Sequence, residues 1–199
     1  QGPAVRGDPA QIIHQQSAAF GHGPPVGQHL PQVLLILRVA EDVAVSDIMS
    51  NGRFDFGIGV GSLFEEFRTF GINPDERVGR TWEMAELIER CFAEQETFSF
   101  KGKYYDFPEI TFTTKPVQQR MPIWWGGEGP KNLQRAAQRG YHLMAGGNLK
   151  ASNAYDEALR AAGRNPADHC IGPMTFTCIA DTEAQAWEAS LEGIHYFIN

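Results

Sequence analysis

The sequence contains few cysteines, few cations and no long apolar run. Cys91, Cys170 and Cys178 lack metal-ligand spacing and leave one thiol over in any disulfide scheme. They sit in apolar contexts, so we expect buried thiols in a reducing compartment, the cytoplasm. The net charge of −7 disfavours nucleic acid and anionic membrane surfaces as partners. The longest aliphatic run, Val33 to Leu37, is far too short for a membrane span.

Residues 1–37 lack the periodicity of the rest of the chain. Ten of the first 31 residues are Gly or Pro, which predicts an irregular or foreign segment. His14, His22 and His29 lie here, but nothing in their spacing fixes a metal geometry, and we predict no metal site. The sequence also shows no paired carboxylates and no nucleophile triad.

From Arg38 onward the pattern is that of an α/β protein. A first helix is followed by four apolar stretches with strand character, and each of these precedes an amphipathic helical pattern; the stretches are 54–60, 123–125, 141–145 and 174–180. The segment 98–107 reads as a hairpin inserted after the first long helix, which we place at 76–94. Such alternation predicts a parallel sheet, either doubly wound or closed into a barrel.

The number of units bears on the extent of the domain. A complete (β/α)8 barrel takes about 250 residues, and four units are half of one. We therefore expect residues 38–199 to form a partial barrel, about four strand–helix units with one insertion, and the chain to be a fragment cut at both ends.

The stretch 122–140 is the most informative part of the sequence. An apolar run ends at Gly126 and Gly127, and a helical pattern begins at Pro130, a residue favoured in a first helical turn. Glycines let a ligand approach the backbone, and the free N–H groups of a helix start favour an anion such as phosphate. A plain tight turn between strand and helix explains the pattern equally well.

Three of the four strand patterns end in glycine, near Gly59, Gly126 and Gly146. The carboxyl ends of parallel strands meet at one edge of a sheet, where α/β proteins place their ligand sites. The sequence therefore predicts a ligand above these ends.

Four stretches together resemble the bacterial-luciferase-like, flavin-dependent monooxygenases. They are RVAEDVAVSDIMSNGRFDFGIGVG, EEFRTFGINPDERVGRTWEMAELI, FKGKYYDF and KPVQQRMPIWWGGEGPKNLQRAAQRGYHLMAGG, in the order and spacing of that family. The resemblance implies a TIM-type barrel, usually a homodimer, that binds reduced FMN or a deazaflavin. It implies a monooxygenase-type oxidoreductase acting with dioxygen on a small organic substrate. A non-catalytic flavin-binding or structural half-barrel, a deazaflavin-dependent hydride-transfer reductase and an unrelated α/β enzyme holding a phosphorylated ligand are the alternatives.

The resemblance also implies cofactor-binding positions. Those around the flavin phosphate are Gly127, Glu128, Gly129 and Asn132, and those on the turn that lies against the cofactor are Gly59, Gly61 and Ser62. The Glu128 carboxylate would repel a phosphate, so we expect this residue to contribute only its backbone.

Two departures from the family pattern limit what can be transferred. Residues 1–37 do not match the part of the family that supplies its catalytic histidine, so no catalytic residue is assigned. Many FMN-binding relatives carry arginine at the position of Val60. Valine supplies no counter-charge, which leaves a differently held FMN or a deazaflavin open.

The remaining conspicuous residues have structural explanations. At most one of Trp124 and Trp125 can face the barrel interior, because neighbours on a strand alternate, and packing is the preferred role for both. Tyr104 and Tyr105 are expected to fix a hairpin rather than to form a substrate lid. Asp47, on the first helix, is expected on a solvated or dimer-contact face.

Overall fold

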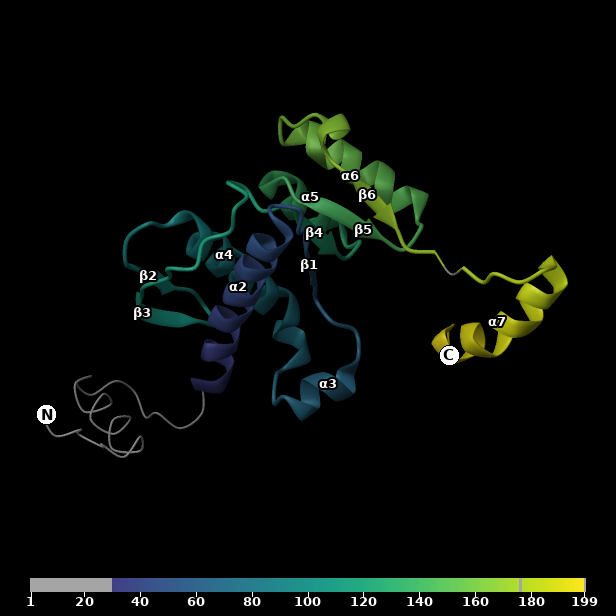
Figure 1. The fold of residues 1–199 in the computed structure, drawn as a ribbon, viewed down its shortest axis with the longest axis horizontal. Helices are drawn as coiled ribbons and strands as arrows, with labels where there is room; N and C mark the ends of the chain where they lie inside the picture. Colours follow the sequence, from purple (N-terminus) through teal and green to yellow (C-terminus); the bar gives the residue numbers. More distant parts are fainter. Residues whose placement is uncertain (1–29, 176, 199) are drawn as a thin grey trace, which may run out of the picture.

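The computed structural model describes residues 30–175 and 177–198. Four parallel strands form one sheet in the order β1-β4-β5-β6, and β2 and β3 form a separate antiparallel pair (Figure 1). The strands are β1 (Phe56–Gly59), β2 (Phe98–Lys101), β3 (Asp106–Ile110), β4 (Ile123–Gly126), β5 (His142–Ala145) and β6 (Ile171–Pro173). The α-helices are α2 (Leu30–Ser50), α3 (Phe64–Thr69), α4 (Arg77–Ala93), α5 (Pro130–Arg139), α6 (Leu149–Ala161) and α7 (Glu183–Ile198), with short 3-10 turns at Pro74–Glu76 and Pro166–Asp168.

The positions of the helices distinguish a barrel from a doubly wound sheet, the two architectures that the strand–helix alternation allows. One cluster of buried side chains joins α2, α4, α5 and α6 to a single face of the sheet, contributed by residues such as Ile58, Trp125 and Leu143. The opposite face carries Trp124 and His142, which are half-buried. A doubly wound sheet has helices on both faces, whereas a barrel has them only outside. The arrangement is therefore that of a partial barrel, as predicted.

The centre of the core is an aromatic stack between sheet and helix. The rings of Trp82, from α4, and Trp125, from β4, are stacked with centroids 3.8 Å apart, and both residues are buried. The Tyr155 hydroxyl, from α6, donates a hydrogen bond to the Tyr141 carbonyl just before β5. Burying residues of this size is worth about 1.5–3 kcal/mol each, so these contacts hold α4, α5 and α6 against the sheet.

Local sequence accounts for both ends of α5. Pro130 occupies the first turn, and Gly140 ends the helix with a φ of 70°. Only glycine adopts this left-handed conformation without strain, and its N–H closes the last helical turn. The helix predicted within 122–140 is therefore confirmed.

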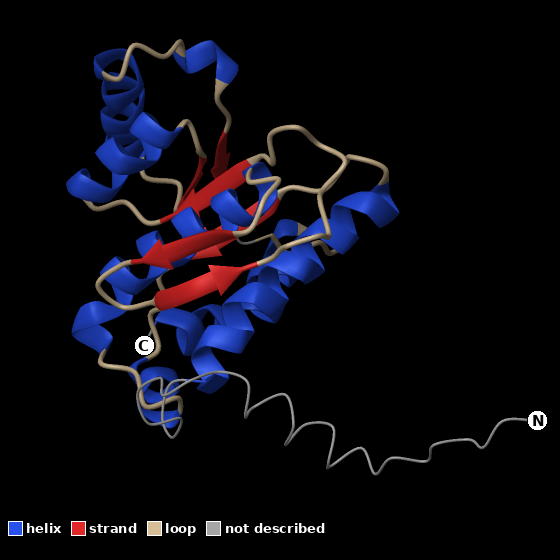
Figure 2. Cartoon of the chain, turned by 90° about the vertical axis from the view of Figure 1, so that its left-hand side faces the viewer, coloured by secondary structure: helices blue, strands red, loops and turns tan. Residues whose placement is uncertain are grey.

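The inserted segment is the predicted hairpin. Figure 2, seen from its side of the molecule, shows the arrows of β2 and β3 pointing in opposite directions. The Glu83 carboxylate on α4 accepts hydrogen bonds from the backbone N–H groups of Lys103, Tyr104 and Tyr105, at 2.7, 2.9 and 3.2 Å. A Cβ at Gly102 would lie 2.2 Å from this carboxylate. The hairpin turn is thus anchored to α4 through its backbone, and glycine is required beside the anchor.

Several predicted boundaries were wrong. The first helix begins at Leu30, so 30–37 is helical and not irregular; residues 1–29, with His14, His22 and His29, lie outside the described residues. The fourth strand is β6 and not 174–180, because pairing with β5 ends at Pro173. Helix α6 begins at Leu149, where the side chain of Asn148 caps it by accepting from the Lys150 N–H at 3.0 Å.

Two predictions about buried and exposed residues were also wrong. Cys91 is buried, and burial raises the pKa of its thiol to about 11, but Cys170 and Cys178 are exposed. Asp47 is 0% exposed, not solvated. Its carboxylate accepts from the Gln118 backbone N–H at 2.9 Å and from the Gln118 side-chain amide at 2.8 Å, which joins α2 to the segment before β4.

Helix α7 lies apart from the sheet (Figure 1). At its start the Thr182 hydroxyl accepts from the Gln185 N–H at 3.3 Å, which is the hydrogen bond of a helix N-cap. Trp187 is 56% exposed and Leu191 is 47% exposed. No helix in the described ranges is both long and apolar enough to cross a bilayer.

Candidate functional site

The carboxyl ends of β1, β4 and β5 meet at one edge of the sheet. Gly59 is in register with Gly126, and Gly126 is in register with Met144, two residues before Gly146. The glycine-tipped ends therefore converge as predicted. A Cβ at Gly126 would lie 3.4 Å from the Ile58 carbonyl oxygen, so the backbones approach closely here.

The turn that follows β4 presents unpaired donors. Gly127 has a φ of 150°, which L side chains rarely adopt. Within the described part of the chain, the backbone N–H groups of Gly127, Glu128, Gly129 and Lys131 donate to no other residue. They precede or begin α5, whose N-terminus carries partial positive charge. The turn can therefore receive an anion.

A side-chain donor lies under the same turn. Trp125 is 0% exposed, and its indole Nε1 has no hydrogen-bond partner among the described residues. A Cβ at Gly127 would lie 3.2 Å from this nitrogen, so the unpaired indole N–H lies directly beside the turn. A buried donor without a partner costs about 1–3 kcal/mol, and an acceptor at this turn would relieve that cost.

The side chain of Asn132 is held in one orientation. Its Oδ1 accepts a hydrogen bond from Trp82 Nε1 at 3.1 Å. This assigns the other amide position to the NH2 group, which lies 3.5 Å from a Cβ built on Gly129. The Trp82 ring therefore directs two further N–H donors toward the start of α5.

The Glu128 carboxylate is directed away from the turn. Its Oε1 accepts from the Gly146 backbone N–H at 2.6 Å, and its Oε2 accepts from the Asn148 side-chain amide at 3.1 Å. Glu128 thus joins the loop after β4 to the loop after β5. This geometry leaves its backbone N–H as the group able to face an anion.

The turn after β1 borders a cavity. The cavity has a volume of about 310 Å³ and borders Gly59, Val60 and Gly61. Its other lining side chains come mostly from α2, α3 and α4 and are mainly apolar, but they include Glu66, Arg77, Arg80 and Tyr105. A Cβ at Gly61 would lie 2.8 Å from the Phe67 ring, so glycine lets this aromatic close over the turn. Ser62 is exposed and does not line the cavity.

Val60 cannot supply a positive charge to a bound phosphate, but Lys131 can. Val60 packs against the core cluster, and its side chain is unsuited to an anion. Lys131 is exposed in the first turn of α5, next to the unpaired N–H groups. Sequence reasoning missed Lys131. Its position directly after Pro130 could have identified it, since a cation at the start of a helix is unfavourable unless an anion is bound there.

The two tryptophans of β4 face opposite sides, as alternation requires. Trp125 packs against the helices, whereas Trp124 lies on the other face, where its Nε1 donates to Asp55 at 2.8 Å and its ring lies 4.9 Å from that of His142. Burial, the largest cause, and the neighbouring His169 lower the pKa of His142; Asp55 acts in the opposite direction, and Arg120 adds a smaller lowering effect. The lowered pKa favours the neutral imidazole, which is suited to packing.

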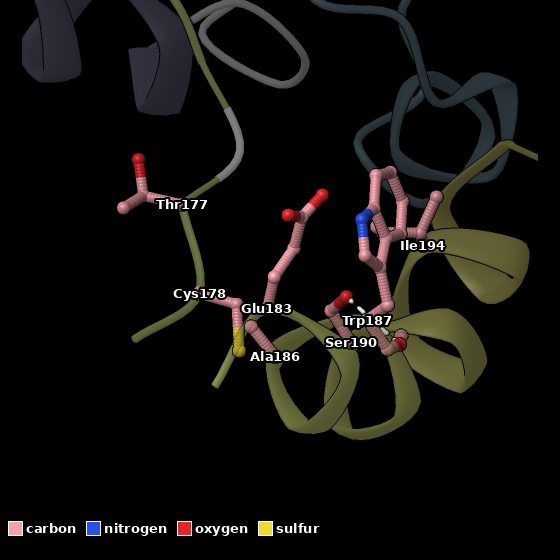
Figure 3. Close-up of a pocket in the computed structure, with 8 residues that line it drawn as sticks. Thr177, Cys178, Glu183, Ala186, Trp187, Ser190 and Ile194 are labelled. Carbon is pink, nitrogen blue, oxygen red and sulfur yellow. Dashed lines mark hydrogen bonds between the residues drawn. The ribbon is translucent and has the colours of Figure 1, made fainter. Parts of the chain in front are cut away.

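A different cavity, of about 450 Å³, lies along α7 (Figure 3). Its lining includes Cys178, Glu183, Trp187 and Ser190, and all its residues come from 177–194. It brings together no parts of the chain that are distant in sequence, so it is a weak candidate for a site. Within the described residues, no group of three or more potential metal ligands was found.

Comparison with known proteins gives one consistent family. The sequence profile of the luciferase-like monooxygenases matches residues 34–198. The FMNH(2)-dependent dimethylsulfone monooxygenase of Pseudomonas putida is 28% identical over 181 residues, covering 88% of this chain and 50% of that protein. The chain spans about half the length of the curated relatives it matches.

Solved structures agree in fold. The monooxygenase RslO1 from Streptomyces bottropensis superposes with a TM-score of 0.72 and 27% identity over 80% of this chain and 51% of that one. An F420-dependent secondary alcohol dehydrogenase, solved with an F420-acetone adduct, superposes with a TM-score of 0.68 and 26% sequence identity. The match covers 78% of this chain and 49% of that one. These likenesses confirm the predicted partial barrel.

Proposed function

The chain belongs to the luciferase-like monooxygenase family, and from this premise we propose that it is part of a flavin-dependent oxidoreductase of the monooxygenase type. The reaction would use reduced FMN and dioxygen on a small organic substrate. The proposal includes the domain at 38–199, a homodimer, and a cytoplasmic location. Support for the activity comes from the FMNH(2)-dependent relative.

The observation that carries the proposal is the set of unpaired donors at the start of α5. Backbone N–H groups at Gly127 to Gly129, the amide of Asn132 and the buried indole N–H of Trp125 surround one turn at the carboxyl edge of the sheet. A phosphate carries several acceptor oxygens and negative charge, which these donors fit. We assign Gly127, Glu128, Gly129 and Asn132 to the flavin phosphate, with Lys131 as its counter-charge.

The turn after β1 would lie against the rest of the cofactor. Gly59 and Gly61 line the 310 Å³ cavity, and Ser62 follows them. The cavity is lined mainly by apolar side chains, with Glu66, Arg77 and Arg80 also on its wall, and it would take a small organic substrate. Bound reduced flavin would supply the electrons for oxygen activation, and the protein would bind, orient and shield the reactants from water.

The second candidate is a deazaflavin-dependent reductase that transfers a hydride. The F420-dependent dehydrogenase of similar fold favours it, as does the valine at position 60. Both cofactors carry phosphate, so the same turn would serve either. Oxygen consumption with reduced FMN supports the first candidate, and deazaflavin oxidation coupled to substrate reduction without oxygen uptake supports the second.

The binding test compares FMN with riboflavin, which lacks the phosphate. Wild-type protein should bind FMN at least about tenfold more tightly, a difference of about 1.4 kcal/mol. Asn132→Asp keeps the acceptor for Trp82 Nε1 but replaces the NH2 group with a charged oxygen, so it should abolish this preference. Asn153→Asp, on exposed α6 surface, adds the same charge elsewhere and is the control. Equal FMN affinity in Asn132→Asp and wild type would contradict the assignment.

A further inference from the structure

A separate cluster of basic side chains lies at the amino ends of the strands, the opposite edge from the glycine tips. Arg120 precedes β4, Arg164 follows α6, and His169 precedes β6. They line an open cavity of about 560 Å³ together with Gly140, His142 and Asp168 among others. The flavin proposal uses none of these residues.

The two arginines are anchored to one helix end. Arg120 Nη2 donates to the Arg139 carbonyl at 2.9 Å, and Arg164 Nη2 donates to the Gln138 carbonyl at 2.9 Å. These carbonyls belong to the last turn of α5, where partial negative charge favours a cation. The two guanidinium groups are thereby fixed side by side without a carboxylate between them.

Gly140 provides the space for both groups. A Cβ at this position would lie 2.6 Å from Arg164 Nη1 and 2.7 Å from Arg120 Nη2. Both nitrogens therefore occupy the volume that any other residue would fill. Two positive charges so close together repel each other, and their repulsion is relieved when an anion binds between them.

Neither charge is neutralised within the described part of the chain. No ion pair there includes Arg120 or Arg164, although Asp168 lines the same cavity. Each guanidinium has five N–H donors, and among the described residues each directs only one hydrogen bond to a protein acceptor. Most of their donors are therefore available to a ligand.

Two histidines on the cavity wall, His142 and His169, are each held by a hydrogen bond at Nδ1. His142 Nδ1 accepts from the Cys170 backbone N–H at 3.1 Å, so the proton of the neutral ring is on Nε2. His169 is held by a hydrogen bond between its Nδ1 and the Asn165 carbonyl at 3.1 Å. The Asp168 carboxylate would repel an anion, but its single negative charge is outweighed by the two positive charges of Arg120 and Arg164.

We propose that Arg120 and Arg164 form a second oxyanion site, at the amino end of the sheet, that binds a phosphate group. Arginine pairs bind phosphate through parallel N–H···O bonds, which gives this group preference over monovalent anions. A cavity of about 560 Å³ has room for a phosphate with a small organic body. The ligand is inorganic phosphate or a small phosphomonoester.

The test titrates the purified chain with inorganic phosphate at constant ionic strength, with sodium chloride as the comparison salt. Backbone amide resonances of Gly140, Gly163 and His169 should shift saturably, and chloride should leave them unchanged. Glycerol phosphate in a parallel titration distinguishes the two sources: tighter binding than inorganic phosphate identifies a phosphomonoester, and weaker binding identifies the free ion. Shifts confined to Gly127–Lys131 would overturn the proposal.

Variants separate this site from the flavin turn. Arg120→Gln and Arg164→Gln should each weaken phosphate binding at least tenfold, whereas Arg160→Gln, on the exposed surface of α6, should not. Arg120→Lys and Arg164→Lys keep the positive charge and replace the glutamine variants in the test if those do not fold. The lysine variants should weaken phosphate binding about threefold or more, because the paired N–H geometry is lost. Saturating FMN and Asn132→Asp should leave phosphate binding at Arg120 intact. Unchanged affinity in the arginine variants would refute the site.

Discussion

The two edges of the parallel sheet present hydrogen-bond donors in different ways. At the carboxyl edge the donors are mainly backbone N–H groups at the start of α5, and glycines such as Gly127 give access to them. At the amino edge they are the side chains of Arg120 and Arg164, held by the carbonyls at the end of the same helix. One helix therefore orients both sets of donors, directly at its start and through arginines at its end.

The difference matters for how each edge tolerates substitution. A backbone site depends on chain conformation, so it is sensitive to the residues that fix φ and to the contacts that hold the turn. A side-chain site depends on a few long residues and on the space that they occupy. In order of expected effect, substitutions at Gly140, Gly127 and Glu128 test this contrast, and Asp47→Asn, second in size, tests the contact that holds the segment before β4.

Gly140→Ala should be the most destabilising of these changes. A left-handed φ of 70° costs an L residue about 1–2 kcal/mol, and the new methyl would displace the two guanidinium groups that bond to the end of α5. We expect a total loss of about 2–4 kcal/mol in the free energy of unfolding by urea. Gly163 has nearly the same φ, 71°, but a Cβ built there has no atom within 4 Å, so Gly163→Ala should cost only the backbone strain. Equal losses would show that the arginines contribute nothing there.

Asp47→Asn should lose about 1–3 kcal/mol at pH 7, because the new NH2 group faces the donors of Gln118. Burial alone would raise the pKa of Asp47, but hydrogen bonds from Gln118 outweigh it, so the pKa is lowered on folding. Its stabilisation is therefore present above the unfolded pKa of about 3.9 and is lost as pH falls through the lower folded pKa.

The gap between wild type and Asp47→Asn should accordingly narrow below about pH 4, as measured by denaturation across pH. Asp42→Asn is the control on the same helix, because Asp42 is exposed and its carboxylate pairs with exposed Arg38 at 2.7 Å. It should change stability by less than about 1 kcal/mol. A gap that is constant across pH would contradict the role assigned to the Asp47 carboxylate.

Gly127→Ala tests the carboxyl edge. The φ of 150° and the 3.2 Å approach to Trp125 Nε1 require the turn to move, which should weaken FMN binding about tenfold, or about 1.4 kcal/mol. Phosphate binding at the amino edge should not change. Gly71→Ala, at a φ of 64° and in open space, controls for backbone strain alone. Fluorescence titration with FMN measures the effect, and unaltered affinity would remove Gly127 from the site.

Glu128→Gln should have the smallest effect. The amide keeps an oxygen that can accept from the Gly146 N–H, and the position is half-exposed, so we expect a loss of stability below about 0.5 kcal/mol. FMN affinity should stay equal or rise slightly, because one negative charge near the phosphate is removed. A large loss of FMN affinity would mean that the carboxylate itself contacts the ligand.

Sequence reasoning was most successful where local rules apply. Pro130 and Gly140 fixed the ends of α5 because both act through their own backbone geometry. The hairpin around Gly102 and the long helix α4 were likewise predicted. The edge at which Gly59 and Gly126 meet followed from the direction of parallel strands.

It failed where a residue's environment comes from distant parts of the chain. Asp47 is buried because Gln118, 71 positions later, reaches it. Cys178 lies beyond the last strand because pairing with β5 stops at Pro173. The pattern at 174–180 has strand character, but among its described residues only Met174 bonds to a neighbouring strand, through its N–H to the Ala145 carbonyl.

By itself, the sequence determined the order of strands and helices, the class of fold and the position of the glycine turn, because these depend on periodicity and on the backbone preferences of glycine and proline. Only the tertiary structure decided that all core helices lie on one face of the sheet. It also turned Glu128 away from the turn, oriented Asn132 through Trp82, and brought Arg120 and Arg164 together over Gly140. The contacts that turn Glu128 and orient Asn132 join residues 18 and 50 positions apart, and no local sequence pattern encodes such contacts.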